Sequence, residues 1–153
     1  MGSEMCIRDR TKAERADRVN ALLSKVGLDL DMAGKYPHEL SGGQQQRVGI
    51  ATALITSPRF IIADEPTTAL DSITQRQIVD LLTSLVDDAG ASMLFITHDL
   101  AVVRQIADEV VVMQHGKLVE HATTDEVFDH PQKQYTRDLL DAIPGGKLQL
   151  GLD

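Results

Sequence analysis

The sequence predicts an α/β fold, in which helices alternate with the strands of a parallel sheet. Two short, continuous apolar runs, 60–63 and 93–96, have the length and composition of strands. The first run is closed by two acids and suits a strand that is buried on both faces of the sheet. Between the runs, apolar residues recur over 78–85 with the spacing of an amphipathic helix. This order of strand, helix and strand indicates an α/β architecture.

Two helices are predicted before the first strand. Apolar residues at i, i+3, i+4 and i+7 mark a helix over 11–26, and Gly27 ends it. After a loop, Ser41 and Gln44 have the spacing of a capping box, in which each side chain accepts a hydrogen bond from the other residue's backbone N–H. The second helix therefore begins at this point and runs to about Thr56.

Further elements are predicted after the first strand, and each has a recognisable start or turn. They are a helix capped by Asp71, a short helix capped by Asp99 over 100–106, a hairpin of 110–113 with 117–121 across Gly116, and a last helix through 139–143 that Pro-Gly-Gly at 144–146 ends.

The composition argues against several classes of protein. At 153 residues the chain has the length of one domain, and its 42% hydrophobic content is ordinary for a soluble globular protein. The net charge of −8 disfavours a general nucleic-acid binder, which relies on clustered Lys and Arg. A single cysteine, Cys6, allows neither an intramolecular disulfide nor a multi-thiolate metal site, which favours cytosolic conditions. No apolar stretch approaches the ~20 residues that span a bilayer, so any membrane role would run through a partner.

The segment 40–44, Leu-Ser-Gly-Gly-Gln, carries the strongest functional signal. Two adjacent glycines at a capped helix start let backbone N–H groups approach an anion without interference from Cβ atoms. The alternative is an ordinary N-cap that contains glycine, but a given five-residue match arises by chance on the order of once per million positions. The segment resembles the signature motif of ATP-binding cassette (ABC) proteins, which faces the γ-phosphate of ATP held by the opposite subunit. The resemblance implies that ATP is bound by four residues here: Ser41, Gly42, Gly43 and Gln44.

The second signal is the pair of acids that follows the first strand. Ligands of α/β proteins bind at the edge of the sheet to which such a strand leads. Taken alone, a strand that ends in Asp-Glu is often only a solvated terminus. The resemblance implies more: Asp64 matches the Walker B residue that orients Mg²⁺ through water, and Glu65 matches the catalytic glutamate that polarises the attacking water.

Two further segments match the family in the family's order. Residues 68–71 resemble the D-loop, which crosses to the other subunit, and the resemblance implies that Asp71 binds ATP, although the segment alone could be a plain helix N-cap. As the cap of a helix, Asp71 would use one carboxylate oxygen for backbone N–H groups and leave the other oxygen free. His98 matches the switch histidine that contacts the γ-phosphate, a catalytic role, although a lone histidine is usually structural. The order of signature, acidic strand, D-loop and histidine carries the resemblance, which covers residues 11–143.

The phosphate-binding loop of the family has no counterpart in the sequence. It needs Gly-x-x-x-x-Gly-Lys followed by Ser or Thr, whereas Lys117 and Lys147 are each followed by Leu. We therefore expect a P-loop NTPase-like three-layer fold, truncated at its N-terminus and incomplete on one side of the sheet, that is inactive on its own. Its expected parts are a foreign leader over 1–10, part of the helical subdomain over 11–56, part of the catalytic core over 57–121, C-terminal helices over 122–143 and a tail over 144–153.

A narrower resemblance concerns the branch of importers for dipeptides, oligopeptides and nickel. It rests on Tyr-Pro-His-Glu at 36–39, His-Pro at 130–131 and the segment 135–140. The alternative for the last segment is an amphipathic helix that merely packs.

The branch implies the ATP-hydrolysing subunit of an importer of peptides or a related small solute. The subunit would bind ATP and Mg²⁺ and pair with a second ATPase subunit. It would also bind transmembrane permease subunits, meet a solute-binding protein indirectly, and bind no nucleic acid. It would lie at the cytoplasmic face of the inner membrane of a bacterium or archaeon, as a peripheral protein. Two alternatives stay open: a cassette protein outside transport, and a non-enzymatic module that offers a signature face to a complete partner.

Overall fold

The computed structural model describes residues 11–68 and 70–143, and these fall into two units. The first unit ends at Ile96 and the second begins at Thr97. The expected leader over 1–10 and tail over 144–153 lie outside the described residues. The boundaries expected after residues 56 and 121 stay predictions.

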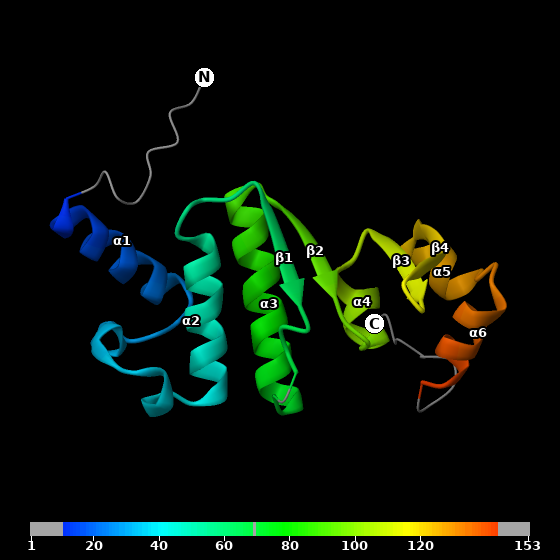
Figure 1. Ribbon diagram of the computed structural model, residues 1–153, viewed down its shortest axis with the longest axis horizontal. Coiled ribbons are helices and arrows are strands. Elements are labelled where there is room, and N and C mark those ends of the chain that lie inside the picture. Colours follow the sequence, from blue (N-terminus) through cyan, green and yellow to red (C-terminus); the bar gives the residue numbers. More distant parts are fainter. Residues whose placement is uncertain (1–10, 69, 144–153) are drawn as a thin grey trace, which may run out of the picture. The chain divides into compact units, whose positions relative to one another are not determined.

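The first unit contains the predicted helices and a parallel pair of strands (Figure 1). In chain order its elements are α1 (Lys12–Lys25), η2 (Leu30–Gly34), η3 (Pro37–Glu39), α2 (Gly42–Leu54), β1 (Phe60–Asp64), α3 (Ser72–Ala89) and β2 (Ser92–Ile96). In the register of the strands Asp64 lies opposite Ile96, so β1 and β2 end at the same edge. The predicted strand, helix and strand order is confirmed.

Local hydrogen bonds explain where these helices begin and end. Thr11 and Glu14 form a capping box at the start of α1, as Ser41 and Gln44 do at the start of α2. The helix α3 ends at Gly90, whose φ of 58° lies in the left-handed region that favours glycine.

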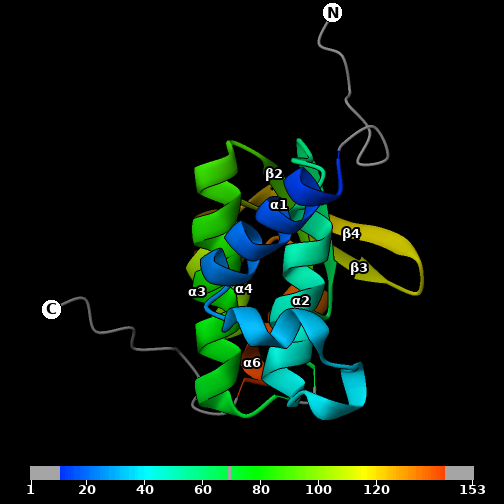
Figure 2. The ribbon, with the colours of Figure 1, turned by 90° about the vertical axis from the view of Figure 1, so that its left-hand side faces the viewer.

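The core of the first unit lies between its helices and one face of the sheet. Figure 2 shows α1 crossing near α2 and α3, which run side by side. Ile78 of α3 and Val26, at the end of α1, are fully buried in this cluster. The Arg47 guanidinium of α2 donates a hydrogen bond of 2.7 Å to the Val26 carbonyl oxygen, which ties α2 to the end of α1.

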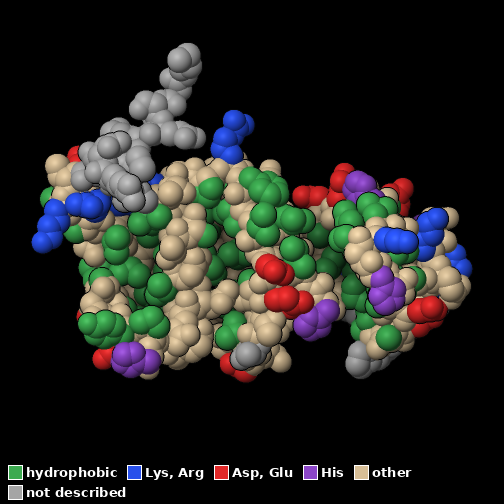
Figure 3. Space-filling view, viewed as in Figure 1, with side chains coloured by type: hydrophobic (Ala, Val, Ile, Leu, Met, Phe, Trp, Pro, Cys, Tyr) green, Lys and Arg blue, Asp and Glu red, His purple; other side chains and the backbone are tan. Residues whose placement is uncertain are grey.

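The prediction that the strand over 60–63 is buried on both faces is wrong. Ile61 and Ala63 face the core, but Phe60 and Ile62 are 55% and 63% exposed. Neighbouring residues of β2 are exposed on the same face, and together they form the exposed sheet face: Phe60, Ile62, Leu94 and Ile96 (Figure 3). Among the described residues of this unit, the helices cover only the opposite face, which agrees with the expected incomplete sheet.

We expect the exposed sheet face to drive self-association of the purified chain, because burying a contiguous apolar patch against a second molecule is more favourable than leaving it in water. Replacing the cross-strand pair Ile62 and Leu94 by threonine should lower the association without disturbing the strands. Sedimentation velocity over a range of protein concentrations measures the effect. Ile73→Thr is the control, since Ile73 is even more exposed than Ile62 and Leu94 but lies on α3, away from the exposed sheet face. A monomeric parent chain at all concentrations would contradict the expectation.

The second unit combines a short helix, a hairpin and two helices. Its elements are α4 (Leu100–Ile106), β3 (Glu109–Gln114), β4 (Lys117–Thr123), α5 (Thr124–Asp129) and α6 (Gln134–Asp141). The hairpin is antiparallel, as predicted, and both turn residues, His115 and Gly116, have positive φ, as a tight hairpin turn requires. The expectation of C-terminal helices over 122–143 gave no bounds for α5, although Thr123 and Glu126 form a capping box at its start.

A buried carboxylate joins the hairpin to the last helix. Glu120 of β4 is only 6% exposed and accepts hydrogen bonds from the backbone N–H groups of Gln132 and Lys133, at 2.8 and 3.2 Å, and from the Thr136 hydroxyl. The Thr136 hydroxyl, and after it the Gln132 N–H, holds the pKa of Glu120 below its usual value. Lys133 caps α6 without a side-chain hydrogen bond, and Glu120 instead anchors the backbone N–H groups of Gln132 and Lys133 immediately before the helix.

Candidate functional site

The turn that leads into α2 is built by its own side chains. Ser41 Oγ accepts a hydrogen bond from the Gln44 N–H at 3.3 Å, and Gln44 Oε1 accepts one from the Ser41 N–H at 2.9 Å. The Gln45 side chain donates to the carbonyl oxygens of Pro37 and Leu40 and so holds the preceding turn. The predicted capping box is confirmed, and the first residues of α2 present backbone N–H groups at a helix N-terminus.

The second glycine of this turn is required by a neighbour that sequence reasoning missed. A Cβ atom on Gly43 would lie 2.9 Å from Cγ2 of Thr74 in α3, which is too close for two carbon atoms. A Cβ on Gly42 would lie 3.8 Å from a methyl group of Leu70, an ordinary contact. Glycine at position 43 therefore serves the packing of α2 against α3.

The two acids after β1 differ in their surroundings. Asp64 is the last residue of β1 and is exposed, whereas Glu65 is half-buried and has a φ of 46°. The Glu65 N–H donates to the Ile96 carbonyl oxygen at 2.9 Å, and Glu65 Oε2 accepts from the Thr68 hydroxyl at 2.9 Å. A left-handed backbone at a non-glycine residue is strained and persists only where surrounding contacts hold it, a feature that clusters at functional sites.

Asp71 caps α3 as predicted, but the expectation of a free second oxygen is wrong. One oxygen, Oδ1, accepts from the N–H groups of Ile73 and Thr74 at 3.1 and 3.0 Å. The other, Oδ2, accepts from the Thr74 hydroxyl at 2.7 Å, because threonine at the third helical position brings its own donor. The Thr74 N–H, followed by the Thr74 hydroxyl, lowers the pKa of Asp71. Each carboxylate oxygen has a second lone pair, so a further donor can still be accepted.

His98 belongs to the second unit. It is exposed and lies between the end of β2 and the helix α4, which Asp99 caps by accepting from the N–H groups of Ala101 and Val102. The Asp99 N–H donates in turn to the Thr97 hydroxyl at 3.0 Å, which shapes the turn that carries His98. Its catalytic role stays a prediction.

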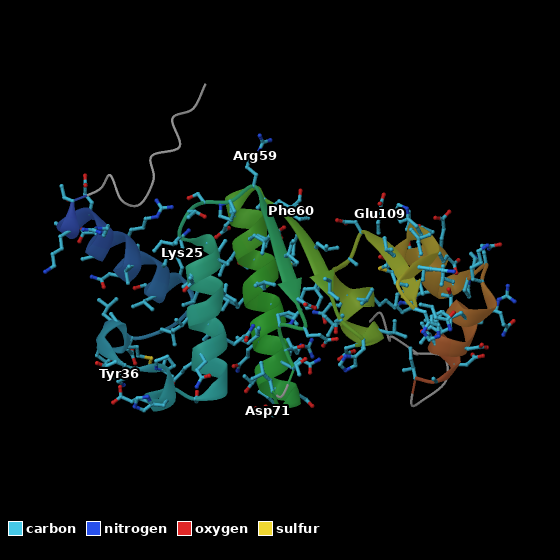
Figure 4. All side chains as sticks on the ribbon, in the orientation of Figure 1. Lys25, Tyr36, Arg59, Phe60, Asp71 and Glu109 are labelled. Atoms are coloured by element: carbon cyan, nitrogen blue, oxygen red, sulfur yellow. The ribbon has the colours of Figure 1, made fainter. Side chains whose placement is uncertain are left out.

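In the first unit the remaining predicted residues lie toward one end. Figure 1 shows the N-termini of α2 and α3 at the end toward which β1 and β2 run, and Figure 4 labels Asp71 there, at the far end from Phe60. This end therefore combines helix N-termini, which favour anions, with the carboxylates of Asp64 and Glu65. Among residues 11–68 and 70–143, no three or more His, Cys, Asp or Glu residues gather to hold a metal ion. One carboxylate with added phosphate oxygens is, however, the usual donor set of Mg²⁺.

Comparison with known proteins decides the family. The family model described as ABC transporter matches residues 2–68. The oligopeptide transport ATP-binding protein OppF of Bacillus subtilis is 53% identical over 135 residues, which cover 88% of this chain and 44% of OppF. The chain belongs to the ABC transporter family. It spans less than half the length of this curated relative.

Solved structures of ABC proteins share the fold. The ATP-binding cassette MJ0796, solved as a dimer in a post-hydrolysis state with ADP and Pi, is 36% identical with a TM-score of 0.66, over 75% of this chain and 49% of MJ0796. For cbiO1 from Clostridium perfringens, part of the ABC transporter complex cbiONQ, the identity is 32% and the TM-score 0.70, over 88% of this chain and 53% of cbiO1. The expected P-loop NTPase-like fold of an ABC ATPase is confirmed.

Proposed function

We propose that this chain is the part of an ATP-hydrolysing importer subunit that offers a signature helix to a second subunit and supplies the acids of its own site. The observation that carries the proposal is the capped N-terminus of α2, with Gly42 and Gly43, at the same end of the unit as Asp64 and Glu65. The Bacillus subtilis relative is an oligopeptide transport ATP-binding protein, which supports peptides or a related small solute as the cargo.

Each residue of the site has a distinct proposed role. The N–H groups at the start of α2, held open by Ser41 and Gln44, bind the γ-phosphate of ATP that the second subunit holds. Glu65 accepts a proton from the attacking water, and its hydrogen bond to Thr68 orients the carboxylate. With its remaining lone pairs, the Asp71 carboxylate accepts further hydrogen bonds from the second subunit. His98 donates a hydrogen bond to the γ-phosphate of ATP.

Asp64 fits Mg²⁺ as a single carboxylate that would orient the ion through water, while the phosphates of ATP would supply direct oxygen ligands. When bound, Mg²⁺ neutralises charge on the transferring phosphate. The exposed position of Asp64 at the end of β1 leaves its carboxylate accessible for this purpose.

The proposed partners follow from the same surface. A second ATPase subunit faces the signature helix, and the dimer described for MJ0796 supports this arrangement. Permease subunits hold the pair at the cytoplasmic face of the inner membrane, and a solute-binding protein delivers the cargo to them. The membership of cbiO1 in a transporter complex supports the permease contact. Among the residues that the structure describes, no helix has the length and apolarity needed to cross a bilayer.

Ser41→Arg tests the signature role in a complete cassette that contains residues 11–143. The long side chain would fill the space in front of the α2 N-terminus, so ATP-driven dimerisation should be lost while the monomer keeps its fold. Size-exclusion chromatography with and without Mg-ATP measures this effect. Ser24→Arg is the control, because Ser24 is exposed on α1, away from the capped turn. Normal dimerisation of Ser41→Arg would remove the proposed role of α2.

A further inference from the structure

Thr74 contacts both Asp71 and the signature turn at Gly43, two parts of the proposed site in the first unit. It is the third residue of α3 and is half-buried. Its N–H and its hydroxyl donate to different oxygens of Asp71, at 3.0 and 2.7 Å. Its methyl group faces the backbone of Gly43, at the distance where a Cβ atom would collide.

These two contacts are linked by the covalent geometry of threonine. The hydroxyl and the methyl group are both attached to Cβ, so a single torsion angle sets the direction of both. When the hydroxyl is bound to Asp71, the methyl group is fixed against Gly43. The spacing between the N-termini of α2 and α3 therefore depends on how Asp71 is held.

We propose that Thr74 is a positioning residue that fixes the signature turn of α2 relative to Asp71, so that the two segments meet the partner subunit as one rigid edge. The proposal rests on the proposed function, since it concerns segments that act on the ATP held between two subunits. A methyl group of Leu70 lies 3.8 Å from the place that a Cβ atom on Gly42 would occupy, so the same two segments also approach each other there.

Two replacements separate the contributions of the hydroxyl and the methyl group. Thr74→Val keeps the methyl group and loses the hydrogen bond to Asp71, whereas Thr74→Ser keeps the hydrogen bond and loses the methyl group. In a complete cassette we expect Thr74→Val to lower kcat about tenfold, because small displacements of positioned groups have effects of this size. The affinity of the monomer for ATP and its melting temperature should change little, and Thr74→Ser should keep more of the activity than Thr74→Val.

Thr83→Val is the matched control on the same helix. The Thr83 hydroxyl donates to the Val79 carbonyl oxygen at 3.0 Å, within the helix itself and not to Asp71. The same chemical change should therefore leave kcat within about twofold. An equal loss in both valine variants, or a loss that only follows the melting temperature, would show that Thr74 is merely structural.

A double-mutant cycle with Gly43→Ala tests the methyl contact directly. The added Cβ collides with the Thr74 methyl group, and Thr74→Ser removes that group, so Gly43→Ala should be less harmful in the serine background by at least about threefold in kcat. Additive effects would overturn the proposal. If the parent cassette hydrolyses no ATP, the proposed function fails, and the same cycle measured by urea midpoint then decides the Thr74 contact alone.

Discussion

Glu65→Gln is expected to lower the steady-state ATP hydrolysis of a complete cassette by about 10²–10⁴-fold, the range typical of a lost general base. The amide has the shape of the carboxylate, and its oxygen can still accept from the Thr68 hydroxyl, so the side chain should keep its position. It cannot accept a proton from water at neutral pH. The bound nucleotide should therefore persist, and the ATP-bound dimer should accumulate. Phosphate release and size-exclusion chromatography measure the two effects.

The control for this variant is a glutamate that the site does not use. Glu109 is exposed on β3 and contacts His121, so Glu109→Gln should leave hydrolysis unchanged. The assignment of Glu65 would be wrong if its glutamine variant hydrolysed ATP at the parent rate. It would also be wrong if the variant no longer bound nucleotide, because the loss would then concern binding and not the chemical step.

The features that depend on a few adjacent residues could be predicted from the sequence. The capping box of Ser41 and Gln44 was found because both hydrogen bonds close within one turn of chain. The cap at Asp71 and the hairpin turn at Gly116 are local in the same sense. The family's motif order then predicted the fold, which the comparisons confirm.

The features that depend on distant neighbours could not be predicted in the same way. A short apolar run such as 60–63 has the same composition whether helices cover one face of its strand or both faces. The exposure of Ile62 could therefore not be predicted from the run itself. Thr74 looked like an ordinary residue of an amphipathic helix, because its role depends on Gly43 in another helix. Glu120 is also such a case, because the three groups that donate hydrogen bonds to its carboxylate all lie beyond α5 in the sequence.

Glu120→Ala is expected to lower the free energy of unfolding of the second unit by about 3 kcal/mol, because each of three donors left without its acceptor costs on the order of 1–3 kcal/mol and part of this cost is relieved by water. The donors are the N–H groups of Gln132 and Lys133 and the Thr136 hydroxyl. Faster hydrogen exchange in α6, measured by mass spectrometry, reports the loss, and peptides from α3 in the first unit provide an internal reference.

The same carboxylate predicts how the second unit responds to acid. The pKa of Glu120 is lowered in the folded state from its ordinary value of 4.5, so the ionised form is the one that folding favours. Its contribution to stability is complete above the unfolded pKa and is lost as the pH falls through the folded pKa. Glu126, whose pKa the Thr123 hydroxyl lowers, adds a component of the same sign. The protection of α6 amides, measured relative to their intrinsic exchange rates at each pH, should therefore fall below about pH 4.5 in the parent chain, and less steeply in Glu120→Ala.

Glu109→Ala separates a buried carboxylate from an exposed one on the neighbouring strand. The Glu109 side chain is 66% exposed and its contact with His121, at 3.0 Å, is screened by water, so its removal should cost no more than about 1 kcal/mol. Since Glu109 and Glu120 belong to the same hairpin, a general effect of losing a negative charge would appear in both variants. Equal exchange rates in α6 for the two variants would contradict the role of Glu120, because only Glu120 accepts hydrogen bonds from the segment that begins this helix.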